Sequence, residues 1–227
     1  MTPVELEALS LSLQVAALAT LASLPFAIAI AYALARTRFP GRALADAVVH
    51  MPLVLPPVVV GYFLLLLFGT RGPIGHWLDS VLGIRLIFTM KGAALASAVM
   101  SFPLMVRAIR LALDAVDPGL EEAARTLGAR PFDTFRSVTL PLMLPGILSG
   151  AVVAFAASLG EFGATITFVS NIEGETRTLP LAIFTATQSP GGEAVAGRLV
   201  LIAFALAIAM LLLSEALARR VAHAVGR

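Results

Sequence analysis

Long apolar runs alternate with short polar segments along the whole chain. A helix that crosses a bilayer needs about 20 mostly apolar residues. Runs of that length predict membrane-spanning helices at about residues 8–35, 47–70, 88–108, 142–162 and 195–217. We therefore expect an all-α polytopic membrane protein with about five transmembrane helices, folded as a single domain over residues 1–227.

The segments between these runs predict loops and short helices. Residues 71–85 contain glycines and prolines and are expected to form a loop. Residues 163–194 are weakly hydrophobic and rich in threonine, and they predict loops around a short helix near residues 179–188. The second apolar run contains Pro52, Pro56 and Pro57 and is counted as one span.

The longest charged, amphipathic stretch lies between the third and fourth predicted spans, at residues 117–141. Asp117 is a good N-cap, and Pro118 suits the first position of a helix. Gly128 is placed to end that helix in a left-handed turn. Pro131 opens a second short helix, which the Leu140-Pro141 pair is expected to stop. The pattern predicts a helix–glycine–helix elbow between two spans.

Composition and charge agree with a membrane protein. Charged residues make up 13% of the chain, whereas a soluble domain has about a quarter. Because net charge is only +2 and the basic residues lie at the ends of spans, we expect no nucleic-acid partner. Cytoplasmic loops of membrane proteins are enriched in lysine and arginine. An outside N-terminus and inside C-terminus leave five of the 16 basic residues outside: Arg71, Arg85, Lys91, Arg177 and Arg198.

The sequence offers no catalytic or metal-binding set. Lys91, the only lysine, follows Met90, so the Walker A pattern for binding ATP phosphates is missing. The chain has no cysteine, and its three histidines are far apart. We expect no bound cofactor and no enzyme activity. A stand-alone channel or secondary transporter, which would need an intramembrane charge relay or ion site, and a membrane-embedded enzyme remain the other two classes.

The residues of the elbow resemble a known sequence motif. Glu122-Ala123-Ala124, then Gly128, then Val138-Thr139-Leu140-Pro141 resembles the EAA motif of ABC importer permeases, which have isoleucine more often at the position of Val138. The resemblance implies a type I ABC importer transmembrane domain whose elbow is a cytoplasmic coupling helix that docks on a separate ATPase subunit. The ATPase-coupling residues that it implies are Glu122, Ala123, Ala124, Gly128, Val138, Leu140 and Pro141.

A second stretch narrows the family. Residues 158–180, SLGEFGATITFVSNIEGETRTLP, resemble the permeases of molybdate ABC importers. Sulfate permeases are similar around residues 160–163, so a sulfate or thiosulfate permease is the alternative. The resemblance implies a homodimer in the bacterial cytoplasmic (inner) membrane, two ATPase subunits that bind the ATP, and an extracytoplasmic oxyanion-binding protein that delivers molybdate or tungstate.

The same stretch holds the candidates for a translocation path or gate. The polar groups suited to an oxyanion are the hydroxyls of Ser158, Thr165 and Thr167 and the backbone N–H groups near Gly160 and Gly163. Each hydroxyl has the alternative of bonding to its own helix backbone. Since the charge of Glu161 would repel a dianion, a structural or gate role is expected for it. With no basic residue in the middle of a span, we expect weak substrate binding in the path.

Overall fold

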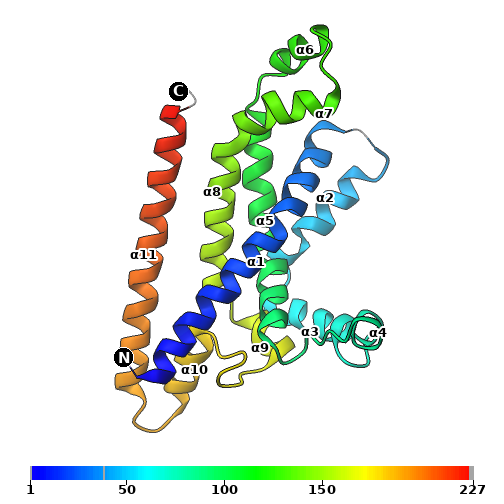
Figure 1. Cartoon of the computed structure of the whole chain (residues 1–227). Helices are drawn as coiled ribbons and strands as arrows, with labels where there is room; N and C mark the ends of the chain where they lie inside the picture. The colour runs from blue at the N-terminus through cyan, green and yellow to red at the C-terminus, as the bar shows by residue number, and fades with distance from the viewer. Residues whose placement is uncertain (1, 38, 225–227) are drawn as a thin grey trace.

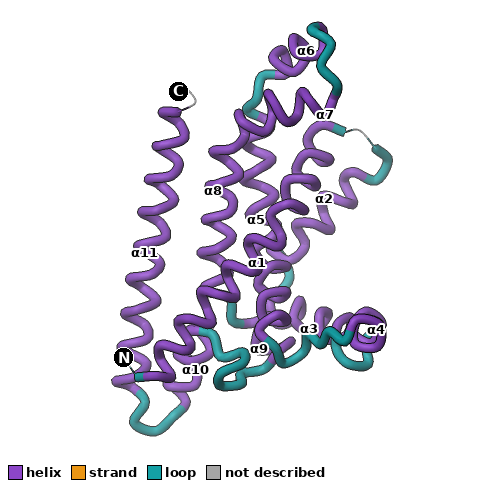
Figure 2. The backbone as a smooth tube through the Cα atoms, viewed as in Figure 1, coloured by secondary structure: helices purple, strands orange, loops and turns teal. Residues whose placement is uncertain are grey.

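The computed structural model describes residues 2–37 and 39–224, in which helices are the only regular elements (Figure 1). Figure 2 shows that the loops gather at the two ends of the helical bundle. The elements are α1 (Pro3–Arg36), α2 (Arg42–His50), η1 (Met51–Leu53), α3 (Pro57–Phe68), α4 (Pro73–Leu82), α5 (Met90–Asp114), α6 (Pro118–Thr126), α7 (Pro131–Thr134), the π-helical η2 (Phe135–Thr139), α8 (Leu140–Leu159), α9 (Gly163–Val169), α10 (Leu179–Gln188) and α11 (Glu193–Ala224).

Four stretches of the described chain are long and apolar enough to cross a membrane: α1, α5, the continuous α7–η2–α8 and α11. A fifth crossing exists if the bent pair of α2–η1 and α3 counts as one span. The prediction of an all-α polytopic protein with about five spans is therefore confirmed at the level of fold class.

The second predicted span differs from the prediction because it is not one straight helix. It is broken between η1 and α3, and the segment of α2 and η1 makes an angle of 111° with α3. Pro56 and Pro57 cause the break, because proline lacks the N–H that a helix needs and disfavours helical geometry in the preceding residue. Pro57 then opens α3, where a missing N–H costs little.

Two further expectations need correction. The predicted loop at residues 71–85 contains α4, which begins at Pro73 and ends before Gly83 in left-handed geometry. The expected stop at Leu140-Pro141 is wrong, because the helix continues from Pro131 to Leu159. The π turn of η2 immediately before Pro141 widens the helix, which removes the clash that a proline ring makes with the preceding turn.

Small residues bring the central helices together. An added Cβ on Gly146 of α8 would lie 2.1 Å from the Cβ of Ala112 on α5, and one on Gly150 would lie 3.2 Å from the Cβ of Ala108. Such close approach is typical of helix contacts in membranes. The core beside this contact is built from α1, α5 and α8 and includes Ala31, Met105, Ile109, Met143 and Ile147.

The two ends of the bundle carry different elements. The N-terminus, α9 and α10 lie at one end, together with α3 and α4, which project to one side in Figure 1. The elbow of α6 and α7 lies at the opposite end. The helix α11 contacts α8 and α10, and most of its large apolar side chains between Val200 and Leu213 are exposed. The elbow is thus presented at the end that the charge distribution assigns to the cytoplasm.

Candidate coupling elbow and translocation path

The elbow begins with the cap that the sequence predicts. The backbone of Asp117 is extended, and its carboxylate accepts a hydrogen bond from the Gly119 N–H at 2.8 Å. Pro118 occupies the first helical position of α6. Asp117 thus accepts one of the free N–H groups in the first turn, and Pro118 has no N–H that needs a partner. A nine-residue helix would be marginal without such a cap.

The first helix of the elbow is ended by the turn at Gly128, whose φ of +89° confirms the predicted left-handed turn. The Gly128 N–H donates to the Arg125 carbonyl at 3.0 Å, and the Ala129 N–H donates to the Ala124 carbonyl at 3.1 Å. This pair of bonds is the Schellman motif. A Cβ at Gly128 would meet nothing within 4 Å, so its conformation, rather than its surroundings, favours glycine.

The outer face of α6 is open to a partner. Glu122 and Ala123 are exposed, and Ala124 is half-buried. Leu127, which the sequence reasoning missed, is 89% exposed at the tip of the elbow. Exposed apolar side chains on a polar helix are typical of docking surfaces. The remaining motif residues lie away from this face, on the helix that returns to the membrane: Val138 and Leu140 are half-buried and Pro141 is exposed.

The inner face of α6 rests on Glu121, which the motif did not single out. Its side chain is the only one of α6 that is buried. The Thr139 hydroxyl donates to Glu121 Oε1 at 2.8 Å, and the Arg36 Nη2 lies 3.5 Å from the same oxygen. The sequence shows Glu121 only as an acidic residue in the first turn of α6, where the helix dipole favours a negative charge, and its partners lie far away in the chain.

Arg36 also binds the end of α5. Its Nη2 donates to the carbonyl oxygens of Leu113 at 3.1 Å and Val116 at 3.3 Å. The last carbonyls of a helix have no partner within the helix, so a cation there is favoured. Arg36 therefore connects the ends of α1 and α5 with Glu121 of α6 at one point.

The candidate path residues divide into buried and partly exposed groups. Ser158 is 4% exposed, and its hydroxyl donates to the Ser101 hydroxyl of α5 at 3.2 Å. Thr165 is 1% exposed, and its hydroxyl has no hydrogen-bond partner. Thr167 donates to the Gly163 carbonyl of its own helix at 2.8 Å, as the alternative reading expected.

The other path candidates surround the break between α8 and α9. Gly160 ends α8 and is exposed. Glu161 is half-buried, and its carboxylate accepts a hydrogen bond from the Ala164 N–H at 2.7 Å. This bond satisfies one of the free N–H groups at the start of α9, which gives Glu161 a structural use within the chain.

Glycines allow α3 and α9 to touch beside the break between α8 and α9. A Cβ on Gly163 would lie 2.7 Å from the Pro57 Cβ. A Cβ on Gly61 would lie 2.6 Å from the Ala164 carbonyl oxygen and 2.8 Å from the Thr167 Cβ. Gly163 therefore serves helix packing in this structure, whatever its backbone contributes to a path.

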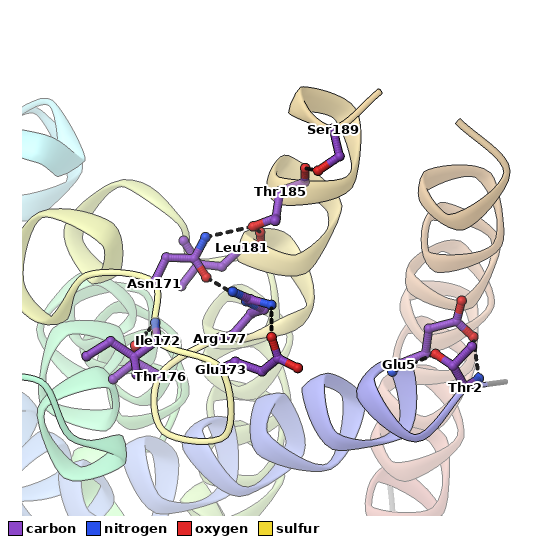
Figure 3. A network of polar contacts seen from close by, with 10 residues as sticks. All are labelled: Thr2, Glu5, Asn171, Ile172, Glu173, Thr176, Arg177, Leu181, Thr185 and Ser189. Atoms are coloured by element: carbon purple, nitrogen blue, oxygen red, sulfur yellow. Dashed lines mark hydrogen bonds and ion pairs between the residues drawn. The ribbon is translucent and has the colours of Figure 1, made fainter. Parts of the chain in front are cut away.

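The loop after α9 is fixed by a polar network, which Figure 3 shows. Arg177 donates to the Asn171 amide oxygen at 3.0 Å and to Glu173 at 2.7 Å. Asn171 in turn donates to the Thr185 hydroxyl of α10 at 2.8 Å. The arginine is thus occupied within the loop. Among the described residues, no three His, Asp or Glu side chains are placed to hold a metal ion.

The family model of the binding-protein-dependent transport system inner membrane component matches residues 23–225. The molybdenum transport system permease protein ModB of Escherichia coli strain K12 is 60% identical over 227 residues, which cover 100% of this chain and 99% of that protein. The sulfate transport system permease protein CysW of Synechocystis sp. is 38% identical over 216 residues, which cover 93% of this chain and 78% of that protein.

A solved structure shares the fold. The structure of a bacterial ABC transporter that imports the acidic polysaccharide alginate has a TM-score of 0.77 and 18% identity, and covers 97% of this chain and 80% of that chain. That alginate transporter has also been solved in complex with an alginate pentasaccharide-bound periplasmic protein. At this identity the likeness concerns the helical arrangement alone.

Proposed function

This chain belongs to the family of binding-protein-dependent transport system inner-membrane components, and we propose that it is the permease subunit of an ATP-driven importer for molybdate. The full-length similarity to the Escherichia coli molybdenum permease carries the proposal. The weaker similarity to a sulfate permease, which covers less of that protein, supports the sulfate or thiosulfate alternative less well.

The elbow is the proposed contact with an ATPase subunit, which binds the ATP. Three features support this role: caps at both ends of α6, the exposed pair Glu122 and Ala123, and the exposed Leu127 at the tip. Burial of a leucine that is exposed in the isolated chain contributes favourable free energy to the binding of a partner. The other face of α6 is held by Glu121, so docking and anchoring use different side chains.

The translocation path is proposed to form between two copies of this chain, near the break between α8 and α9. Gly160 and Glu161 are the candidates with exposed or half-exposed positions there, and Thr167 and Gly163 are half-buried. Ser158 and Thr165 would contribute only if the helices around them moved, since both are buried within the chain. An extracytoplasmic binding protein would supply the affinity and the selectivity for the oxyanion, because tight binding in the path would slow release.

Uptake of labelled molybdate in a strain that lacks the gene tests the substrate. We expect uptake from trace molybdate to be lost in this strain and to return with the wild-type gene. High external molybdate should remove the need for the importer. Excess tungstate should compete if the importer carries both anions. Unchanged molybdate uptake together with lost sulfate uptake would establish the sulfate alternative in place of this proposal.

A further inference from the structure

We propose that Arg36, Glu121 and Thr139 form a mechanical joint through which displacement of the elbow is passed to α1 and α5. The proposal rests on the proposed function, in which an ATPase moves the elbow. It assigns Arg36 as a positioning residue for coupled transport, although Arg36 lies at the end of the first span, far from the elbow in sequence.

The joint is the main side-chain anchor of α6. The apolar side chains of this short helix are exposed or half-buried, with Leu120 at 47%, and Glu121 is the single buried residue within it. The Glu121 side chain is 10% exposed, and its Oε1 accepts a hydrogen bond from the Thr139 hydroxyl and forms an ion pair with the Arg36 guanidinium at 3.5 Å. The helix α6 is therefore held to the bundle by directed polar contacts, whereas the following η2 also packs its Phe135 ring against Tyr32 of α1.

Arg36 turns this anchor into a three-way connection. One nitrogen, Nη2, reaches Glu121 on α6 and the carbonyls of Leu113 and Val116 at the end of α5, while the side chain belongs to α1. A movement of α6 that keeps the ion pair therefore pulls on the ends of both spans. The Nε of Arg36 is buried without a hydrogen-bond partner, so the guanidinium has a second donor to offer Glu121 when the elbow shifts.

The helix α1 extends this connection to the other end of the molecule. Near its N-terminus, Glu5 is 2% exposed and pairs with Arg198 of α11 at 2.7 Å. The Ser12 hydroxyl oxygen of α1 accepts the Leu179 N–H at the start of α10 at 2.6 Å. The elbow is thus linked by one continuous helix to α10 and α11, beside the polar loop of Figure 3.

A second ion pair provides a matched control. Arg110 of α5 binds Asp46 of α2 at 2.9 Å, at the same end of the bundle, and their side chains are 29% and 39% exposed. This pair joins two helices of the bundle and does not include α6. Loss of the Arg110 pair should therefore disturb local charge without disturbing the elbow.

The test uses the complete complex in proteoliposomes, with its ATPase and binding protein loaded with molybdate. For Arg36→Met we expect normal assembly and basal ATP hydrolysis, but about tenfold less molybdate delivered per ATP hydrolysed. Arg36→Lys, which keeps a charge but loses the planar fork, should restore part of the ratio. Glu121→Gln should resemble Arg36→Met, and the double variant should be no worse than either, because both changes remove one interaction.

The outcomes are distinct. A wild-type complex that the loaded binding protein does not stimulate contradicts the proposed function itself. A stimulated wild type, with Arg36→Met no more impaired than Arg110→Met, overturns the joint alone. If Arg36→Met fails to assemble, Thr139→Val decides, because it removes only a hydroxyl and keeps both charges. A lowered delivery per ATP in Thr139→Val supports the joint, and an unchanged ratio overturns it.

Discussion

Replacing Gly61 by alanine should separate α3 from α9. Gly61 lies in the middle of α3 and faces α9 without a side chain between them. The new Cβ would lie 2.6 Å from the Ala164 carbonyl oxygen, 2.9 Å from the Ala164 Cα and 2.8 Å from the Thr167 Cβ. Non-bonded contacts of a Cβ atom this short do not occur in folded proteins, so one of the two helices must move.

The size of the effect follows from what must move. Two of the three contacted atoms belong to the backbone of Ala164, which cannot rotate away as a flexible side chain does. One methyl group forced into a packed core costs about 1–3 kcal/mol, and a rigid neighbour favours the upper half of that range. For a chain of this size, about 2 kcal/mol lowers the unfolding temperature by about 4–8 °C.

Thermal unfolding of the purified protein in detergent measures this shift, with Gly197→Ala as the matched control. Gly197 lies within α11, where an added Cβ meets nothing within 4 Å, so alanine there should leave the unfolding temperature unchanged or slightly higher. Molybdate uptake should fall in Gly61→Ala and remain in Gly197→Ala. Equal unfolding temperatures for Gly61→Ala and the wild type would refute the close α3–α9 contact.

Two further predictions concern the elbow and the orientation of the chain. Gly128→Val should destabilise the left-handed turn by about 1–2 kcal/mol while the spans stay folded. The variant should therefore insert normally but lose stimulation of the ATPase. Gly128→Ala should show a milder loss. Wild-type stimulation of Gly128→Val would mean that this turn does not set the docking geometry. In right-side-out vesicles an impermeant thiol reagent should label Glu175→Cys and leave Arg130→Cys unmodified, and the reverse pattern would contradict the outside N-terminus.

Local signals in the sequence were enough to predict the first helix of the elbow and the turn that ends it. The cap at Asp117, the first-turn proline Pro118 and the left-handed Gly128 each act within a few residues, and each stands where it was predicted. The apolar runs likewise predicted the long spans, because burial in lipid depends on composition alone. The start of α4 at Pro73 and its end before Gly83 follow the same capping rules, so this helix could also have been predicted.

The features that the sequence did not predict depend on distant contacts. Pro56 and Pro57 mark the place of the break in the sequence, but hydropathy cannot distinguish a straight span from a bent pair, since both are apolar. The bent arrangement also depends on α9, which packs on Gly61 and lies far away in the chain. The role of Glu121 depends on Arg36, whose position in sequence gives no sign of the pairing. Charge and hydroxyl groups in the sequence show what can bind, but only the fold shows which groups meet.

The length of α1 has a consequence for the surrounding lipid. Its uncharged part, residues 8–35, is about 42 Å long at 1.5 Å per residue, whereas the hydrocarbon core is about 30 Å thick. A tilt of roughly 40° resolves this hydrophobic mismatch, and Figure 1 shows α1 running obliquely across α8 and α5. A thicker bilayer would draw the helix upright and a thinner one would lay it down. Because ion pairs fix both ends of α1, bilayer thickness would act on the elbow and the outer loops together, which makes acyl-chain length a physical variable of this protein.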